Sequence, residues 1–135
     1  MSAVDLVYQR ISTKLGDKLT TFIGDPPEAA EPPYAFVWGP PLILNTPLAG
    51  DSKQLLDALL NVTVVHSTPN NVLLLAGQVR DALTGFIPEV DGWGFSPIRV
   101  TGSQPVLTPH SVVDTDTNRS PAWVVLHLRV RGQQA

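Results

Sequence analysis

The strongest constraint on the fold is a change of hydrophobic period within residues 61–86, NVTVVHSTPNNVLLLAGQVRDALTGF. Up to Ser67, apolar residues alternate with polar ones, which is the period of a strand with one buried face. After Pro69, apolar residues recur at helical spacing. The pattern therefore predicts a strand over residues 60–67 followed at once by a helix over residues 69–84.

Local signals support this strand-to-helix unit. Ser67 or Thr68 can cap the helix, and Pro69 fits its first turn, where the missing amide costs no hydrogen bond. Gly85 fits the left-handed position that follows a helix end. The side chains expected to be buried are Val72, Leu75, Ala76, Val79 and Leu83.

The N-terminal part predicts a second helix and a further strand. Residues 2–15 repeat apolar side chains at helical spacing, and Asp5 falls in the first turn, where the helix dipole favours a carboxylate. Four prolines within residues 24–33 exclude a helix or a central strand there. Residues 34–38, YAFVW, then read as a strand. Tyr34, Phe36 and Trp38 share one of its faces.

The clearest period-2 pattern is AWVVLHLRVR, residues 122–131, which predicts a strand. One face must cover a core: Ala122, Val124, Leu126, Leu128 and Val130. The other face is mixed, and we expect Trp123 and Val125 on it to be half exposed. Because exposed aromatic and aliphatic side chains beside arginine are typical of association sites, this face is a candidate interface. Its residues are Trp123, Val125, His127 and Arg129.

The segment GPPLILNTPLAGDSKQL, residues 39–55, is unusually long for a connection in a compact domain. Two interpretations stay open: a loop folded onto its own core, or an arm that inserts into a neighbouring subunit. The residues that make it apolar, and a second candidate interface, are Leu42, Ile43, Leu44 and Leu48. The leucines of residues 55–60 have helical spacing and predict a helical turn before the strand. Another strand is expected at residues 98–101, and residues 87–97 are expected to form an irregular loop.

No cluster of residues predicts catalysis, cofactor binding or metal binding. DTDTN, residues 114–118, begins like a calcium loop, but Arg119 and Val125 stand where an EF-hand needs glycine and glutamate. His110, Ser111 and Asp114 are too close in sequence to form a triad across a rigid scaffold. We therefore expect no enzyme.

Composition narrows the partners further. The 135 residues suggest a single domain, residues 1–135. With a net charge of −3 and nine scattered basic residues, neither nucleic acid nor an anionic membrane is an expected ligand. The chain has no cysteine, and its N-terminus lacks the basic and apolar regions of a signal peptide. Charged residues make up 16% against the usual ~25%, which suits extensive contact between subunits.

In order, these elements resemble the tail terminator (tail completion) proteins of long-tailed bacteriophages, most closely those of phages with actinobacterial hosts. The likeness spans nearly the whole chain. It rests on PPYAFVW, LNVTVVHS, TPNNVLLLAGQVRDALTG and AWVVLHLRVR.

The resemblance implies an α+β subunit, with a twisted, mainly antiparallel sheet of about four strands, two helices packed on one face, and long loops. It implies a homohexameric ring on the head-proximal end of the tail tube, assembled in the host cytoplasm and kept in the virion. The implied partners are further copies of the chain, the major tail tube protein and a head-completion or connector protein. Genomic DNA would pass through the lumen without specific binding.

Two alternatives remain. One is another head–tail connector component, a stopper or an adaptor. The other, from a different class, is a small cytosolic enzyme or ligand-binding domain. Residues 39–55 are longer and more apolar than a minimal pattern of the family. The question of which surface of the ring this segment serves therefore stays open.

Overall fold

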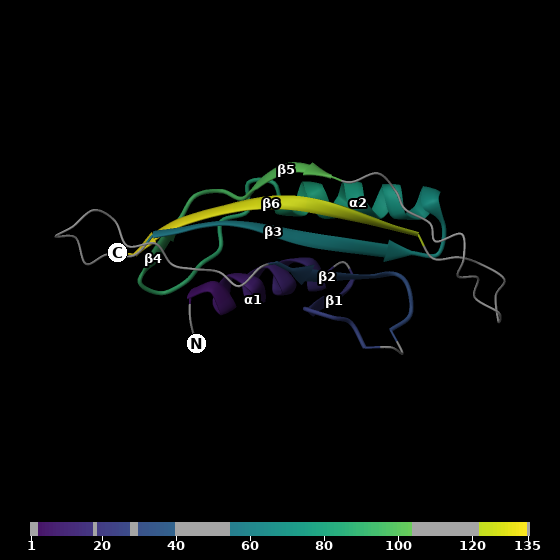
Figure 1. Ribbon diagram of the computed structural model, residues 1–135, viewed down its shortest axis with the longest axis horizontal. Coiled ribbons are helices and arrows are strands. Elements are labelled where there is room, and N and C mark those ends of the chain that lie inside the picture. The colour runs from purple at the N-terminus through teal and green to yellow at the C-terminus, as the bar shows by residue number, and fades with distance from the viewer. Residues whose placement is uncertain (1–2, 18, 28–29, 40–54, 104–121, 135) are drawn as a thin grey trace.

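The computed structural model describes residues 3–17, 19–27, 30–39, 55–103 and 122–134, in which two helices and six strands form an α+β fold (Figure 1). The helices are α1 (Ala3–Gly16) and α2 (Pro69–Leu83). The strands are β1 (Thr20–Ile23), β2 (Tyr34–Trp38), β3 (Leu55–His66), β4 (Trp93–Phe95), β5 (Arg99–Ser103) and β6 (Ala122–Gln134).

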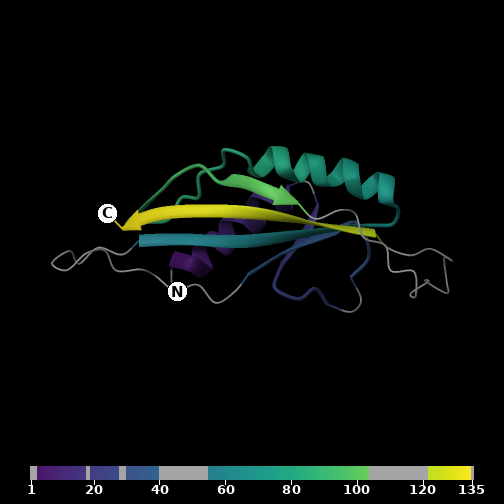
Figure 2. The ribbon, with the colours of Figure 1, turned by 45° about the horizontal axis from the view of Figure 1, so that its top comes forward.

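All six strands belong to one sheet in the order β1-β2-β3-β6-β4, and β5 also pairs with β6. Among the strands that the structure describes, only β1 and β2 pair in parallel, and every other pair is antiparallel. The pairing of β3 with β6 is the longest, running from Leu55 opposite Gln133 to His66 opposite Ala122. These two strands lie side by side across the whole molecule (Figures 1 and 2). The expected mainly antiparallel sheet is confirmed, but six strands replace the expected four.

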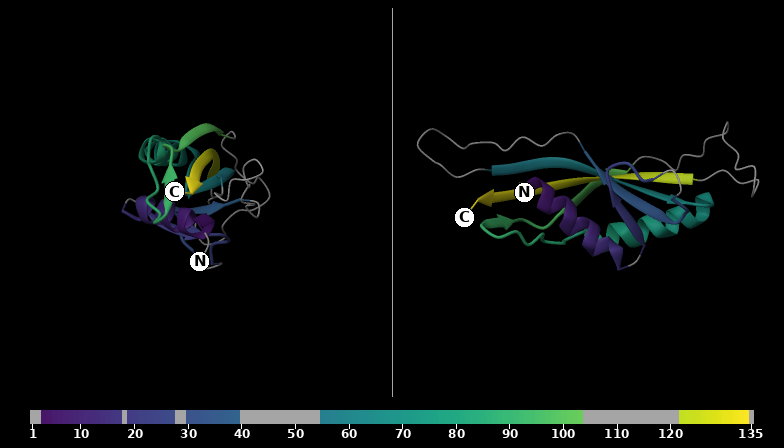
Figure 3. Two further views of the ribbon diagram at one scale, coloured as in Figure 1. Left: turned by 90° about the vertical axis from the view of Figure 1, so that its left-hand side faces the viewer. Right: turned by 90° about the horizontal axis from the view of Figure 1, so that it is seen from below.

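Both helices pack on the same face of the strongly curled sheet (Figure 3). We call this the inner face and the opposite one the outer face. Strand residues alternate between the faces, so the inner face receives every second residue of β2, β3 and β6. Those that are fully buried include Ala35, Val37, Leu60, Val62, Val64, Leu128 and Val130.

Both helices bury the stripes that the sequence predicts. On α1, Val7, Ile11 and Leu15 are fully buried. On α2, the buried residues are Val72, Ala76, Val79 and Leu83, whereas Leu75 is only partly buried.

The expected ends of α2 are also confirmed. Thr68 is the N-cap, and its side-chain oxygen accepts a hydrogen bond from the Asn71 amide at 3.2 Å. Pro69 stands in the first turn, and Gly85 has a φ of 82°, in the left-handed region.

Two expectations about strands were wrong, and one strand was missed. Residues 55–60 continue β3 instead of forming a helical turn, because they pair with residues 128–133 of β6 and bury Leu56 and Ala58. The four-residue β1 was missed, since it is a short edge strand that pairs only with β2. Residues 87–97 are not wholly irregular, because β4 pairs with the end of β6.

Candidate functional site

The outer face carries a continuous set of apolar and aromatic side chains from β2, β3 and β6. Residues directly opposite each other in antiparallel strands share a face. The register therefore aligns Tyr34, Val65 and Trp123 in one row across the three strands. The next row holds Phe36, Thr63 and Val125.

Together these rows line a groove, which we call the outer groove. Its volume is about 470 Å³. It is lined by Pro26, Tyr34, Phe36, Trp38, Thr63, Val65, Trp123 and Val125. No helix of the described residues covers it, because α1 and α2 both lie on the inner face (Figure 3).

Aromatic contacts and one hydrogen bond fix the walls of the outer groove. The rings of Tyr34 and Phe36 stack with centroids 6.4 Å apart, and Phe22 meets Tyr34 edge-on at 6.0 Å. The Trp38 indole N–H donates to the Thr63 hydroxyl at 2.8 Å. Trp38 nevertheless stays 41% exposed. The groove is thus built and held within the subunit, while Trp38 remains exposed and Tyr34, Phe36 and Trp123 are only partly buried.

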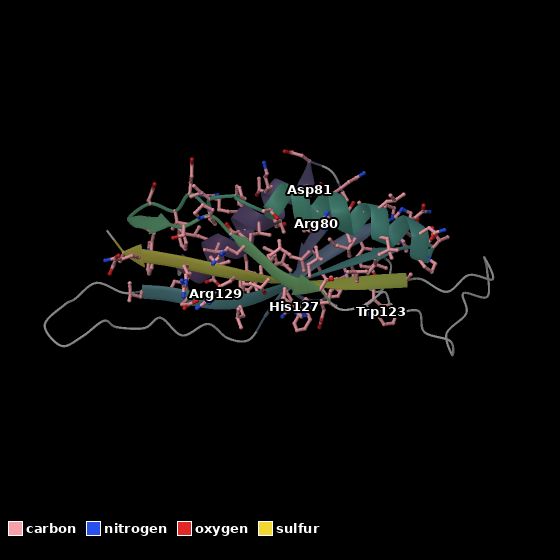
Figure 4. All side chains as sticks on the ribbon, turned by 90° about the horizontal axis from the view of Figure 1, so that it is seen from above. Arg80, Asp81, Trp123, His127 and Arg129 are labelled. Carbon is pink, nitrogen blue, oxygen red and sulfur yellow. The ribbon has the colours of Figure 1, made fainter. Side chains whose placement is uncertain are left out.

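Of the residues expected on this face, Trp123 is half-buried and takes part in the groove wall. The expectation for Val125 was wrong, because only 7% of it is exposed. It lines the groove among larger side chains, Trp123 and Phe36, and so forms part of the floor. Figure 4 shows Trp123, His127 and Arg129 following one another along β6.

His127 makes a polar contact within the sheet. Its Nδ1 lies 2.8 Å from Oδ1 of Asn61, which stands opposite it on β3. This contact with a side-chain amide indicates that His127 packs against its neighbour in the sheet. His66, the other strand histidine, accepts a hydrogen bond from the Ser67 amide at 2.7 Å.

Beyond His127 the outer face becomes charged. Arg129 donates two hydrogen bonds to Asp57, at 3.1 and 2.9 Å, and Arg131 approaches the same carboxylate at 3.5 Å. The hydrogen bond from Arg129, and then the positive charges of both arginines, lower the pKa of Asp57. Arg99 of β5 stands opposite Arg129. We call Arg99, Arg129 and Arg131 the arginine cluster; two of its members, Arg129 and Arg131, share Asp57.

A second apolar surface lies on α2, and sequence reasoning missed it. Leu73 is 56% exposed and Leu74 is 70% exposed. Leu73 borders a groove of about 510 Å³ between α2 and β5. The signal was present in the sequence: three consecutive leucines, residues 73–75, spread over some 200° of a helix at about 100° per residue, so one buried stripe does not cover all three.

The structure does not test the second candidate interface, which the sequence places within residues 39–55. Leu42, Ile43, Leu44 and Leu48 lie outside the described residues, as do His110, Ser111 and residues 114–118. Within the described residues, no three His, Asp or Glu side chains gather as metal ligands would. None of the described helices has the length and apolarity to cross a membrane.

Comparison with models of known protein families and with curated proteins finds no match to this chain.

Proposed function

We propose that this protein is a tail terminator of a long-tailed bacteriophage. Six copies form a ring on the head-proximal end of the tail tube. The ring stops polymerisation of the tube and offers a docking surface to the head connector. The proposal combines the resemblance of the sequence with the two exposed apolar surfaces of the subunit.

The observation that carries the proposal is the outer groove together with the exposed leucines of α2. A ring uses heterologous interfaces, so each subunit needs two different complementary surfaces. The outer groove is on one side of the sheet, and Leu73 and Leu74 are on the helix side. A subunit that exposes both surfaces is suited to head-to-tail association.

Charge is consistent with a conduit for DNA. The net charge is −3, and only nine of 135 residues are Lys or Arg. Since affinity for DNA comes largely from basic side chains at phosphates, such a chain does not hold the genome that passes it.

The test of the proposal is the mass of the assembled particle. We expect size-exclusion chromatography with light scattering to give a ring of six subunits, either alone or when tube protein is added. In a phage that lacks this gene, we expect overlong tails in negative-stain images. A protein that stays monomeric with and without tube protein contradicts the proposal, whereas heads that are capped but tailless do not distinguish a terminator from a stopper.

A single substitution tests whether the outer face is the interface. Trp123→Asp places a charge in the wall of the outer groove, so we expect a folded subunit that no longer assembles. Circular dichroism and thermal melting measure the fold, and light scattering measures assembly. Ile87→Asp is the matched control, because Ile87 is 49% exposed and lies outside both apolar surfaces. Assembly retained by Trp123→Asp excludes the outer face as an interface.

A further inference from the structure

Charges of opposite sign lie on the two sides of the molecule. Around Asp57 the outer face holds three arginines, so that the arginine cluster with Asp57 has a formal charge of +2, whereas Asp25 and Glu31 lie on the connection from β1 to β2. On the helix side, residues 5–17 and 69–92 hold five acidic and three basic residues, a formal charge of −2. The acidic residues are Asp5, Asp17, Asp81, Glu89 and Asp91, and the basic ones are Arg10, Lys14 and Arg80. The arginine cluster of one copy therefore attracts the acidic helix side of another.

The helix side also presents an ordered stripe of exposed residues. Leu74 points directly away from the buried stripe of α2 and is 70% exposed. At helical spacing, Gln78 and Asp81 share its face, and both are exposed. We call these three residues the α2 stripe: apolar at its N-terminal end and acidic at its C-terminal end. The outer face has the matching order, with the apolar groove at one end and the arginine cluster at the other.

We infer that the α2 stripe of one subunit lies along the outer face of a second copy, with Leu74 in the outer groove and Asp81 at the arginine cluster. This rests on the proposed function, because such contacts repeated head to tail build the ring.

The dimensions of the two surfaces agree. At 1.5 Å per residue, Leu74 and Asp81 are about 10 Å apart along α2. At 3.4 Å per residue, Val125 in the groove floor and Arg129 are about 14 Å apart along β6. The long arginine side chain spans the difference. In this orientation the negative C-terminal end of the helix dipole also faces the arginines.

The arginine cluster has donors left for such a partner. Arg129 uses its Nε and one terminal nitrogen on Asp57, so its other terminal nitrogen is not engaged by that carboxylate. Arg131 makes a single, longer contact to Asp57, and its side chain is 54% exposed. Asp81, in turn, lies 3.6 Å from its neighbour Arg80, and its side chain is 77% exposed. Figure 4 shows Asp81 and Arg80 on α2, and His127 and Arg129 on β6.

A charge exchange tests the pairing. Asp81→Arg places like charges at the contact, so we expect the concentration needed for half-assembly to rise by about tenfold or more. Arg129→Glu is expected to have a similar effect, and the double variant to restore assembly. Arg129 is chosen because its distance from the groove floor matches the span from Leu74 to Asp81. Asp91→Arg makes the same change of charge outside the α2 stripe and serves as the control.

A cross-link tests the register. The chain has no cysteine, so Gln78→Cys with His127→Cys gives one defined pair of thiols. Both positions spare the groove and the ion pairs, and they lie on opposite faces of a subunit, which prevents linkage within one chain. With a short bismaleimide, we expect a ladder of products up to six subunits on a denaturing gel. Each single-cysteine variant is expected to give dimers at most.

The outcomes separate the inference from the proposed function. If the wild-type protein never assembles, with or without tube protein, both fail. If rings form but Asp81→Arg assembles as the wild type does, or the double variant is not restored, the inference fails and the ring remains. Rings that give no ladder beyond a dimer likewise overturn the inference and indicate that another part of the chain, or a tube subunit, covers the outer groove.

Discussion

On β3, Leu59 and Leu60 are neighbours in sequence but lie on opposite faces of the sheet. Leu60 is fully buried beneath the helices, whereas Leu59 is 61% exposed on the outer face. The same division runs along β6, where Leu128 is fully buried and the adjacent His127 and Arg129 are only partly buried. One strand thus serves two purposes. Its inner side chains stabilise the subunit, and its outer side chains form a surface that the subunit does not need for its own core.

Polarity separates the two faces as clearly as burial does. The residues of β3 and β6 that are buried on the inner face are all aliphatic. The outer face mixes aromatic side chains with a hydrogen-bonded Asn61, an ion-paired Asp57 and the arginines. Interfaces that form between folded proteins have this mixture of apolar centre and polar margin. The contrast implies that substitutions on the inner face change the free energy of unfolding, and those on the outer face change association.

The largest expected effect is that of Leu60→Ala. Removing this buried side chain leaves a cavity and is expected to lower the free energy of unfolding by about 2–5 kcal/mol. Leu59→Ala is the matched control on the adjacent residue, and we expect a change within about 0.5 kcal/mol. Urea denaturation of both variants measures the difference. Equal losses for the two leucines would break the distinction between the faces.

A smaller effect is expected at Gly132, at the far end of β6. Here β4 takes part in covering the core, and a Cβ built on Gly132 would overlap the ring of Phe95. Gly132→Ala must displace that ring, which we expect to cost about 1–3 kcal/mol of stability. Differential scanning calorimetry checks this, and Gly94→Ala is the control because nothing lies near its Cβ position. No loss at Gly132 would show that β4 moves aside freely.

The sequence predicted the inner face well because burial imposes periodicity. The α2 helix with its caps, the β6 alternation and the α1 stripe all follow from the spacing of apolar residues. The sequence-based prediction failed where strand pairing, and not the spacing of apolar residues, decides the structure. Residues 55–60 have leucines at helical spacing, but they pair with β6 and form a strand. The short β1 and β4 carry too few residues for any period to show.

The candidate interface was predictable only in part, for a related reason. The alternation of β6 placed Trp123, His127 and Arg129 on the outer face, as found. It gave no sign of the groove, which needs Trp38 and Tyr34 from β2 and Trp123 from β6 on either side of β3. Such a surface depends on which strands are neighbours, and only the sheet topology reveals that. The sharing of Asp57 by two arginines was hidden for the same reason.

Asp57 gives the smallest effect on stability and the finest test of the contrast between the faces. Its hydrogen bond from Arg129, aided by the charges of both arginines, lowers its pKa in the folded state. The carboxylate therefore contributes stability above its unfolded pKa of about 3.9. That contribution is lost as the pH falls through the lower folded value. Asp57→Asn should be slightly less stable than the wild type at pH 7, by less than Gly132→Ala, because the pair is solvent-exposed.

The difference between Asp57→Asn and the wild type should shrink in acid below about pH 4, and also in high salt. Urea titrations at several pH values measure it, and a difference that is constant with pH would contradict the assignment. Assembly should respond with the opposite sign. Without Asp57 the arginine cluster is more positive, so an acidic partner such as Asp81 of a second copy is bound more tightly at pH 7. A substitution that weakens the fold yet strengthens association is the result expected if this part of the outer face serves contacts between subunits.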